Sequence, residues 1–253
     1  MLRYNNWSIE QDQWLPATEA DLEQQLTFTN DYLCQTAHFE EHFSGSKRCC
    51  TYIKGIENPV LNISAISVRL QDERLDLAEW DVQEFYRCMH KNQPMLERRV
   101  LATSPKGHTI ELVARRQLLV DKKEAMRLEF SVRSVNYSGP ITILSVLRGD
   151  NDVEPWFTLT NYVGDDYCWL WSHIQPISVQ VCCAMRYQMF INGQAIVKRP
   201  IKIEKQEVIG YSLTQHVTPN DVLLLHKDVV VLDSLNHGQE GLIDKTLACL
   251  TNW

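Results

Sequence analysis

Apolar and polar residues alternate with a period of two through most of residues 50–149. One of the clearest runs covers residues 126–133. This period places one face of a β-strand in a core and the other face in solvent. Turn-forming residues separate the runs, for example at 104–107 and 136–139. The pattern predicts an all-β fold in which antiparallel strands form two packed sheets.

Two local features refine this prediction. Apolar residues stand at odd-numbered positions from Leu61 to Ala65 and at even-numbered positions from Ile66 onward. This change in the alternation predicts a β-bulge between Ala65 and Ile66. Asn192 and Gly193 stand between two apolar runs and form the strongest hairpin signal in the chain.

Other signals set the limits of single strands. Pro94 predicts a break between one strand at residues 82–89 and another at 95–102. Residues 222–233 predict a strongly apolar strand, which we expect to be interrupted at the polar residues 226–228.

The first 46 residues have a less regular pattern. We expect an edge strand near Trp7 and a helical turn near Leu22 within residues 1–26. Residues 27–46 are aromatic and acidic, and they predict a loop.

The pattern changes to helical spacing at the C-terminal end. We expect a helix that begins after Gly241 and runs for about three turns to Trp253. The apolar residues at this spacing are Leu242, Ile243, Thr246, Leu247 and Leu250. We therefore divide the chain into a β-sandwich at residues 1–237 and the start of a helical linker at 238–253. If the sandwich covers this stripe only in part, the chain is expected to self-associate through it, as a homodimer for example, or to be disordered there.

Composition narrows the classes of function. The chain has 253 residues, 44% of them hydrophobic, which is ordinary for a globular protein. The net charge is −7 and the basic residues are scattered, so we expect no nucleic-acid partner. No apolar run is long enough for a membrane span, and the N-terminus has no signal-peptide core, so a cytoplasmic location is expected.

The eight cysteines include two adjacent pairs, Cys49-Cys50 and Cys182-Cys183, and no C-x-x-C motif. The absence of that motif argues against a zinc ribbon. We expect buried free thiols in a reducing compartment.

A series of short motifs follows in order along the chain. They are Phe28 to Cys34 followed by Phe39-Glu40-Glu41, Cys50 to Gly55, Val60-Leu61-Asn62, Arg87, Leu96-Glu97-Arg98, Gly107, Arg115, and residues 222–234 with a central Lys227. No motif is specific alone, but over roughly residues 7–253 their order and spacing resemble the N-terminal domain of glycoside hydrolase family 65. That family contains phosphorylases of maltose, trehalose and kojibiose and some hydrolases.

The chain departs from the family pattern in one loop. Asp31, Cys34 and Ala37 stand where the family prefers glycine, and Thr36 stands where it prefers arginine. Because glycine often marks a positive φ or a close backbone approach, we expect a different conformation around Asn30.

The resemblance implies a galactose-mutarotase-like, two-sheet β-super-sandwich, followed by a helical linker and an (α/α)6-barrel. In this family the catalytic acid and the phosphate-binding residues lie in the barrel. The chain is therefore expected to hold no catalytic, cofactor-binding or metal-binding residue, to need no cofactor, and to have the barrel of its own parent chain as partner. The parent would act on α-glucosidic disaccharides by phosphorolysis or hydrolysis. A free-standing carbohydrate-binding module and a mutarotase-like enzyme remain as alternatives.

Three sets of residues are candidates for chemistry. His38 to His42 fits the H-x-x-E-H pattern of zinc proteases, but that chemistry requires a helix, and we expect a polar loop. Glycosidases use a pair of carboxylates at a defined separation. Adjacent carboxylates in turns do not establish that separation, so we expect the carboxylates of this chain to be solvated in loops. They are Glu40, Glu41, Asp72, Glu73, Asp165 and Asp166. A sugar-stacking platform could be formed by Trp156, Trp169 and Trp171, with Tyr162 and Tyr167, although core packing explains such aromatics as well.

Overall fold

The structure is a computed structural model that describes residues 2–45, 51–56, 61–149, 156–174, 178–205 and 207–252. For residues 156–159 it describes the backbone alone.

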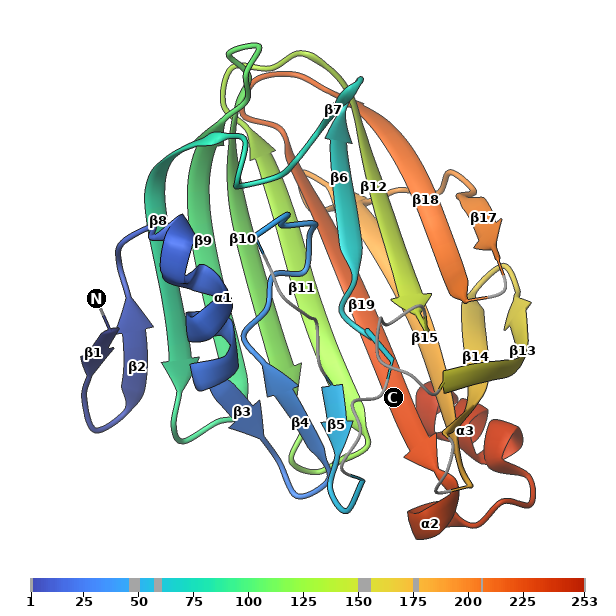
Figure 1. Cartoon of the computed structure of the whole chain (residues 1–253). Helices are drawn as coiled ribbons and strands as arrows, with labels where there is room; N and C mark the ends of the chain where they lie inside the picture. The colour runs from blue at the N-terminus through green and yellow to red at the C-terminus, as the bar shows by residue number, and fades with distance from the viewer. Residues whose placement is uncertain are drawn as a thin grey trace.

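One large curved sheet forms the back layer of the molecule (Figure 1). In the described residues it has eleven strands, and β16 (Gln194–Ala195) pairs only with β15. The other ten follow each other across the sheet in the order β1 (Leu2–Tyr4), β2 (Ser8–Gln11), β8 (Asp81–His90), β9 (Met95–Thr103), β10 (Thr109–Leu118), β11 (Ala125–Ser134), β19 (Val222–Asp233), β15 (Val179–Ile191), β14 (Tyr167–Ile174) and β13 (Trp156–Val163).

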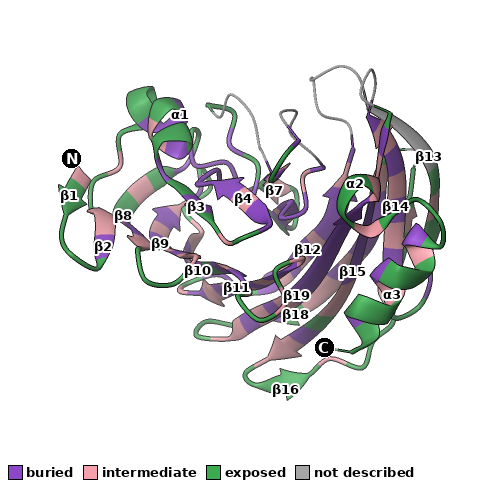
Figure 2. Cartoon of the chain, turned by 90° about the horizontal axis from the view of Figure 1, so that it is seen from below, coloured by how far each residue is buried: buried purple, intermediate pink, exposed green. Residues whose placement is uncertain are grey.

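Two smaller sheets and a helix form the front layer, on the inner side of the curve (Figures 1 and 2). Helix α1 (Pro16–Gln25) and the three-stranded sheet lie over the β8–β10 side, and the five-stranded sheet lies over the other side. The three-stranded sheet has the order β3 (Thr27–Thr29), β4 (Leu33–Thr36) and β5 (Thr51–Ile53). The five-stranded sheet has the order β17 (Ile201–Glu204), β18 (Val208–Val217), β12 (Gly139–Arg148), β6 (Ile66–Leu70) and β7 (Glu73–Arg74).

The predicted all-β sandwich is confirmed, and its core lies between the two layers. Alternate residues of β10 and β11 are buried, as the period of two requires. Leu112, Phe130 and Val132 from the large sheet and Val68 and Ile143 from the five-stranded sheet belong to one apolar cluster. All strand pairs in the described residues are antiparallel. The three-stranded sheet was not predicted.

Several local predictions are also confirmed. Asn192 and Gly193 have φ values of 50° and 79°, the positive values that a tight two-residue hairpin turn requires. The break at Pro94 lies between β8 and β9. Near the predicted bulge, Asn62 pairs with Arg148 and Ile66 pairs with Ser145. The segment that leads into β6 therefore has one residue more between these two pairs than β12 has, as in a bulge. The edge strand near Trp7 is the β1–β2 hairpin.

The structure corrects three expectations. Residues 16–25 form a full helix rather than a single turn. The predicted loop at 27–46 contains β3 and β4. Strand β19 runs without interruption through residues 226–228, because Lys227 faces the core with its side chain fully buried. Its Nζ donates to the Val146 carbonyl, 2.7 Å away, on the five-stranded sheet.

The C-terminal helix packs on the outer face of the large sheet (Figure 2). Helix α2 (Ser234–His237) follows β19, and α3 (Leu242–Thr251) then buries Leu242 and Leu250 against Ala184, Val230 and Leu232. The chain's own sheet thus covers most of the apolar stripe, and the physical argument for self-association through it is lost. Among the residues that the structure describes, no helix is both long and apolar enough to span a membrane.

Candidate functional site

Three buried arginines project from the inner face of the large sheet. Arg87 on β8 stands directly opposite Arg98 on β9, and Arg116 lies on the same face of β10. Each is at most 2% exposed. Burying a charge costs free energy unless the charge is paired and hydrogen-bonded. These arginines therefore need counter-ions and hydrogen-bond acceptors from the front layer.

Residues of the N-terminal segment supply those partners. Glu19 of α1 lies 2.6 Å from the Arg87 guanidinium. Glu40 binds both Arg98, at 2.7 Å, and Arg116, at 2.6 Å. The segment that the sequence marked as a loop is therefore fastened to the sheet by ion pairs.

One sequence expectation fails at this network. Glu40 and Glu41 are 4% and 3% exposed, so they are not solvated loop carboxylates. Glu41 also binds Arg98, through two contacts. Arg115, which the family motif was matched to, is half exposed beside Glu97, and its neighbour Arg116 is the buried arginine.

The two carboxylates experience different electrostatic surroundings. Burial favours the neutral form of Glu40, but the positive charges of Arg116 and Arg98 outweigh it and lower the pKa of Glu40. Burial dominates for Glu41 and raises its pKa, with Arg98 acting in the opposite direction. Glu40 is thus the carboxylate that the arginines hold in its charged form.

The H-x-x-E-H segment does not gather its histidines at one point. Residues 38–42 form no helix. His38 is buried and its Nε2 lies 2.7 Å from the Ser64 hydroxyl, while His42 is at the surface with Nε2 3.4 Å from Asp76. Burial and the nearby Arg116 lower the pKa of His38 well below its usual value, so its ring is neutral. The described residues contain no group of three or more metal-ligating side chains suitably placed for an ion.

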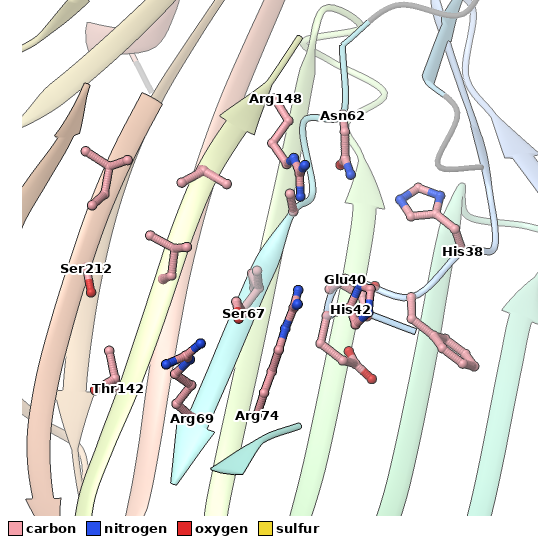
Figure 3. Close-up of a pocket in the computed structure, with 17 residues that line it drawn as sticks. His38, Glu40, His42, Asn62, Ser67, Arg69, Arg74, Thr142, Arg148 and Ser212 are labelled. Carbon is pink, nitrogen blue, oxygen red and sulfur yellow. The ribbon is translucent and has the colours of Figure 1, made fainter. Parts of the chain in front are cut away.

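A cavity of about 520 Å³ opens beside this segment, on the outer face of the five-stranded sheet. It lies where β6 and β12 meet the 38–42 segment (Figure 3). The cavity is lined by His38, Phe39, Glu40, Glu41, His42, Asn62, Ala65, Ile66, Ser67, Arg69, Arg74, Thr142, Leu144, Val146, Arg148, Ile203 and Ser212.

Three arginines make the cavity strongly basic. Arg69 on β6 pairs directly with Arg74 on β7, and Arg148 comes from the end of β12. In Figure 3, Arg148 extends into the cavity from one end and Arg74 from the other, with Arg69 and Ser67 alongside. Burial lowers the pKa of His42, and the charges of Arg74 and Arg148 lower it further, against the attraction of Asp76. This cluster has no signal in the sequence, because its members come from three separate elements.

The candidate sugar-stacking residues lie elsewhere, on the large sheet. Trp169 and Trp171 are half buried and pack beside α3. The rings of Tyr162 and Trp169 are stacked, with centroids 6.2 Å apart, and Tyr162 is 45% exposed. The side chain of Trp156 lies outside the described residues.

The remaining candidate carboxylates are spread over the surface. Asp72 pairs with Lys106, and Glu73 binds His108. Asp165 pairs with Lys202 and, with Asp166, lines a second cavity of about 590 Å³. The fold therefore does not join them to Glu40 and Glu41.

Four of the described cysteines are buried free thiols, as expected: Cys88, Cys168, Cys182 and Cys183. Burial raises the pKa of Cys182 to about 12, which makes its thiol inert. Cys34 is half buried and Cys249 is exposed, which differs from the expectation. Cys49 and Cys50 lie outside the described residues.

The chain matches known proteins along its length. A family model described as "Glycosyl hydrolase family 65, N-terminal domain" matches residues 9–252. The α,α-trehalose phosphorylase of Thermoanaerobacter brockii is 25% identical over 60% of this chain and 23% of its own length. The kojibiose phosphorylase of Halothermothrix orenii is 24% identical over 90% of this chain and 31% of its own length. The α,α-trehalose phosphorylase of Geobacillus stearothermophilus is 24% identical over 97% of this chain and 37% of its own length.

A solved structure described as "Putative kojibiose phosphorylase from human microbiome" has the same fold. It superposes with a TM-score of 0.84 at 16% identity, over 99% of this chain and 36% of the other. The chain thus spans only 23% to 37% of the length of these relatives. Since the family model covers almost every residue, the chain belongs to glycosyl hydrolase family 65, as an N-terminal domain of that family.

Proposed function

We propose that this chain is the non-catalytic N-terminal β-sandwich of a family 65 enzyme that acts on α-glucosidic disaccharides, most simply by phosphorolysis. The observation that carries the proposal is the family match over residues 9–252, together with relatives of which the chain spans only 23% to 37%. In this proposal residues 1–237 support a C-terminal (α/α)6-barrel, and residues 238–253 begin the connection to it. The free thiols suit a reducing compartment, which supports a cytoplasmic location.

The chemistry of the cavity agrees with a non-catalytic role. Glycoside cleavage needs a carboxylic acid that can protonate the leaving oxygen, and a second carboxylate at a defined separation. Among the described residues, Glu40 and Glu41 are the only carboxylates that line the arginine-rich cavity, and both are held by Arg98. The arginines lower the pKa of Glu40, so this carboxylate is a poor proton donor to a substrate, and both oxygens of Glu41 are engaged by Arg98.

An assay of the purified 253-residue chain tests the proposal. We expect no release of glucose 1-phosphate or glucose from trehalose, kojibiose or maltose in phosphate buffer. The protein encoded by the whole reading frame is expected to release it from one of them. Sugar release by the chain alone, lost in Glu40→Gln or Glu41→Gln variants that still fold, would refute the non-catalytic role.

A second candidate function is carbohydrate binding at the stacked pair of Tyr162 and Trp169. The exposed Tyr162 ring offers an apolar face of the kind that binds sugars. Titration of the chain with maltose, followed by tryptophan fluorescence, should show saturable binding that Tyr162→Ala weakens. Tyr4→Ala is the matched control, because Tyr4 is also exposed but lies at the opposite edge of the sheet. Equal binding by both variants would remove this candidate.

A further inference from the structure

We propose that the cavity on the outer face of the five-stranded sheet binds a phosphate group, as inorganic phosphate or a phosphate monoester, through Arg69, Arg74 and Arg148. This inference concerns a site on the chain itself and does not depend on the proposed enzymatic role.

The pairing of Arg69 with Arg74 is the first reason. Like charges directly opposite each other on antiparallel strands destabilise a sheet. Within the described part of the chain, neither guanidinium makes a hydrogen bond or a close ion pair. The three buried arginines of the large sheet, by contrast, each have a carboxylate partner. Arg69 and Arg74 are exposed and therefore solvated, and a bound dianion would offset the repulsion between their charges.

Among the described residues, three carboxylates near the arginines already have other partners. Glu40 and Glu41 are bound to Arg98. Asp76 attracts Arg74 but accepts hydrogen bonds from the backbone N–H groups of Ser44 and Ala78, and it faces His42. In the part of the chain that the structure describes, Arg69 therefore has no carboxylate partner, and Arg74 has only the attraction of Asp76.

The lining between the arginines suits phosphate. Ser67, Thr142 and Ser212 add hydroxyl groups to the cavity, and Asn62 adds an amide. Guanidinium groups bind phosphate oxygens in pairs of parallel hydrogen bonds, and neutral hydroxyl groups complete such sites.

The shape of the site favours a small anion over an acidic protein segment. Its volume of about 520 Å³ lies within the range of small-molecule pockets. The three arginines come from β6, β7 and β12 and surround one cavity, instead of following a groove along the surface (Figure 3). We therefore assign the site to a free phosphate or a phosphorylated small molecule.

Binding measured on the 253-residue chain by calorimetry tests this proposal. The probes are inorganic phosphate, glucose 1-phosphate and a poly-glutamate peptide in low-salt buffer. We expect saturable binding of at least one phosphate probe, weakened about tenfold or more in Arg69→Ala and in Arg74→Ala, because each removes a charge-assisted contact. Arg115→Ala is the control, since Arg115 is an exposed arginine on the large sheet.

The comparison of probes identifies the source of the phosphate group. Tighter binding of glucose 1-phosphate than of inorganic phosphate assigns the site to a monoester, and equal binding assigns it to free phosphate. Binding of poly-glutamate alone would overturn the proposal in favour of an acidic protein segment. Phosphate binding that Arg69→Ala and Arg74→Ala leave unchanged would also overturn it.

The His42 imidazole provides an independent readout by NMR. A bound phosphate offsets the charges of Arg74 and Arg148, which lower the pKa of His42, so saturating phosphate should raise that pKa. An unchanged His42 titration at saturation would count against the site. The arginine variants should fold normally, since removing Arg69 relieves a like-charge contact.

Discussion

At the scale of single residues, Glu40 connects the two layers of the sandwich. It lies between Arg98 and Arg116, and all three side chains are almost fully buried. Removing one member of a buried ion pair leaves an uncompensated charge, and that loss is usually much larger than the loss of a surface pair.

We predict that Glu40→Gln lowers the free energy of unfolding by about 3 kcal/mol, because it leaves Arg116 buried without a counter-ion. Glu111→Gln is a matched control: Glu111 lies 2.6 Å from the Arg133 Nε, the same separation as between Glu40 and the Arg116 Nε, but both side chains are 38% exposed. The control should cost less than about 1 kcal/mol. Urea denaturation of both variants measures the difference, and equal effects would show that burial of the pair contributes nothing.

His38 makes stability depend on pH. Its folded-state pKa is lowered, first by burial and then by the charge of Arg116. The unfolded chain therefore binds a proton near pH 6.5 that the folded chain does not, so the stability from this group is present above that pH and decreases as pH falls.

We predict that lowering the pH from 7.5 to 5.5 destabilises the wild type more than a His38→Gln variant, by about 1 kcal/mol. Urea titrations of the two proteins at both pH values give this difference directly. Parallel losses in the two proteins would mean that His38 is protonated equally in the folded and unfolded states.

At the scale of elements, the apolar stripe of α3 packs on the sandwich, although the sequence did not show which surface would cover it. Leu242 and Leu250 are each 2% exposed against the outer face of β15 and β19. Small residues on that face, such as Ala184 and Cys182, leave room for the helix to approach. The helix is thus part of the folded unit described here.

We predict that Leu242→Ala lowers stability by about 2–3 kcal/mol, as expected for a leucine whose removal leaves a cavity. Leu235→Ala, in the neighbouring α2, changes the same residue type where it is 63% exposed. That control should stay within about 0.5 kcal/mol of the wild type. Thermal unfolding followed by circular dichroism compares them, and a small effect of both would show that α3 contributes little to the fold.

At the scale of the whole molecule, chain order and spatial order differ. The N-terminal segment and α1 cover strands β8–β10, which follow them in sequence, while β19 lies in the middle of the large sheet, between β11 and β15. The basic cavity opens on the outer face of the five-stranded sheet, and α3 lies on the outer face of the large sheet (Figures 2 and 3). The proposed phosphate site and the proposed connection to a barrel therefore lie on opposite faces of the sandwich.

The sequence alone determined most of the long strands, the main turns and the family. A period of two is a local property, so residues 109–118 and 125–134 specify strands whatever their partners are. The turn at Asn192-Gly193 is likewise local, because it depends on which residues tolerate a positive φ.

Only the tertiary structure decided which charged residues are buried and which ones meet. Lys227 looked like an interruption because a lysine is rarely buried, but the carbonyl of Val146, distant in sequence, satisfies it in the core. Arg115 and Arg116 are neighbours in sequence, and the pleat of β10 directs only Arg116 inward to Glu40. Arg69, Arg74 and Arg148 meet because β6 pairs with both β7 and β12, and strand pairing at such separations depends on packing of the whole core rather than on local pattern.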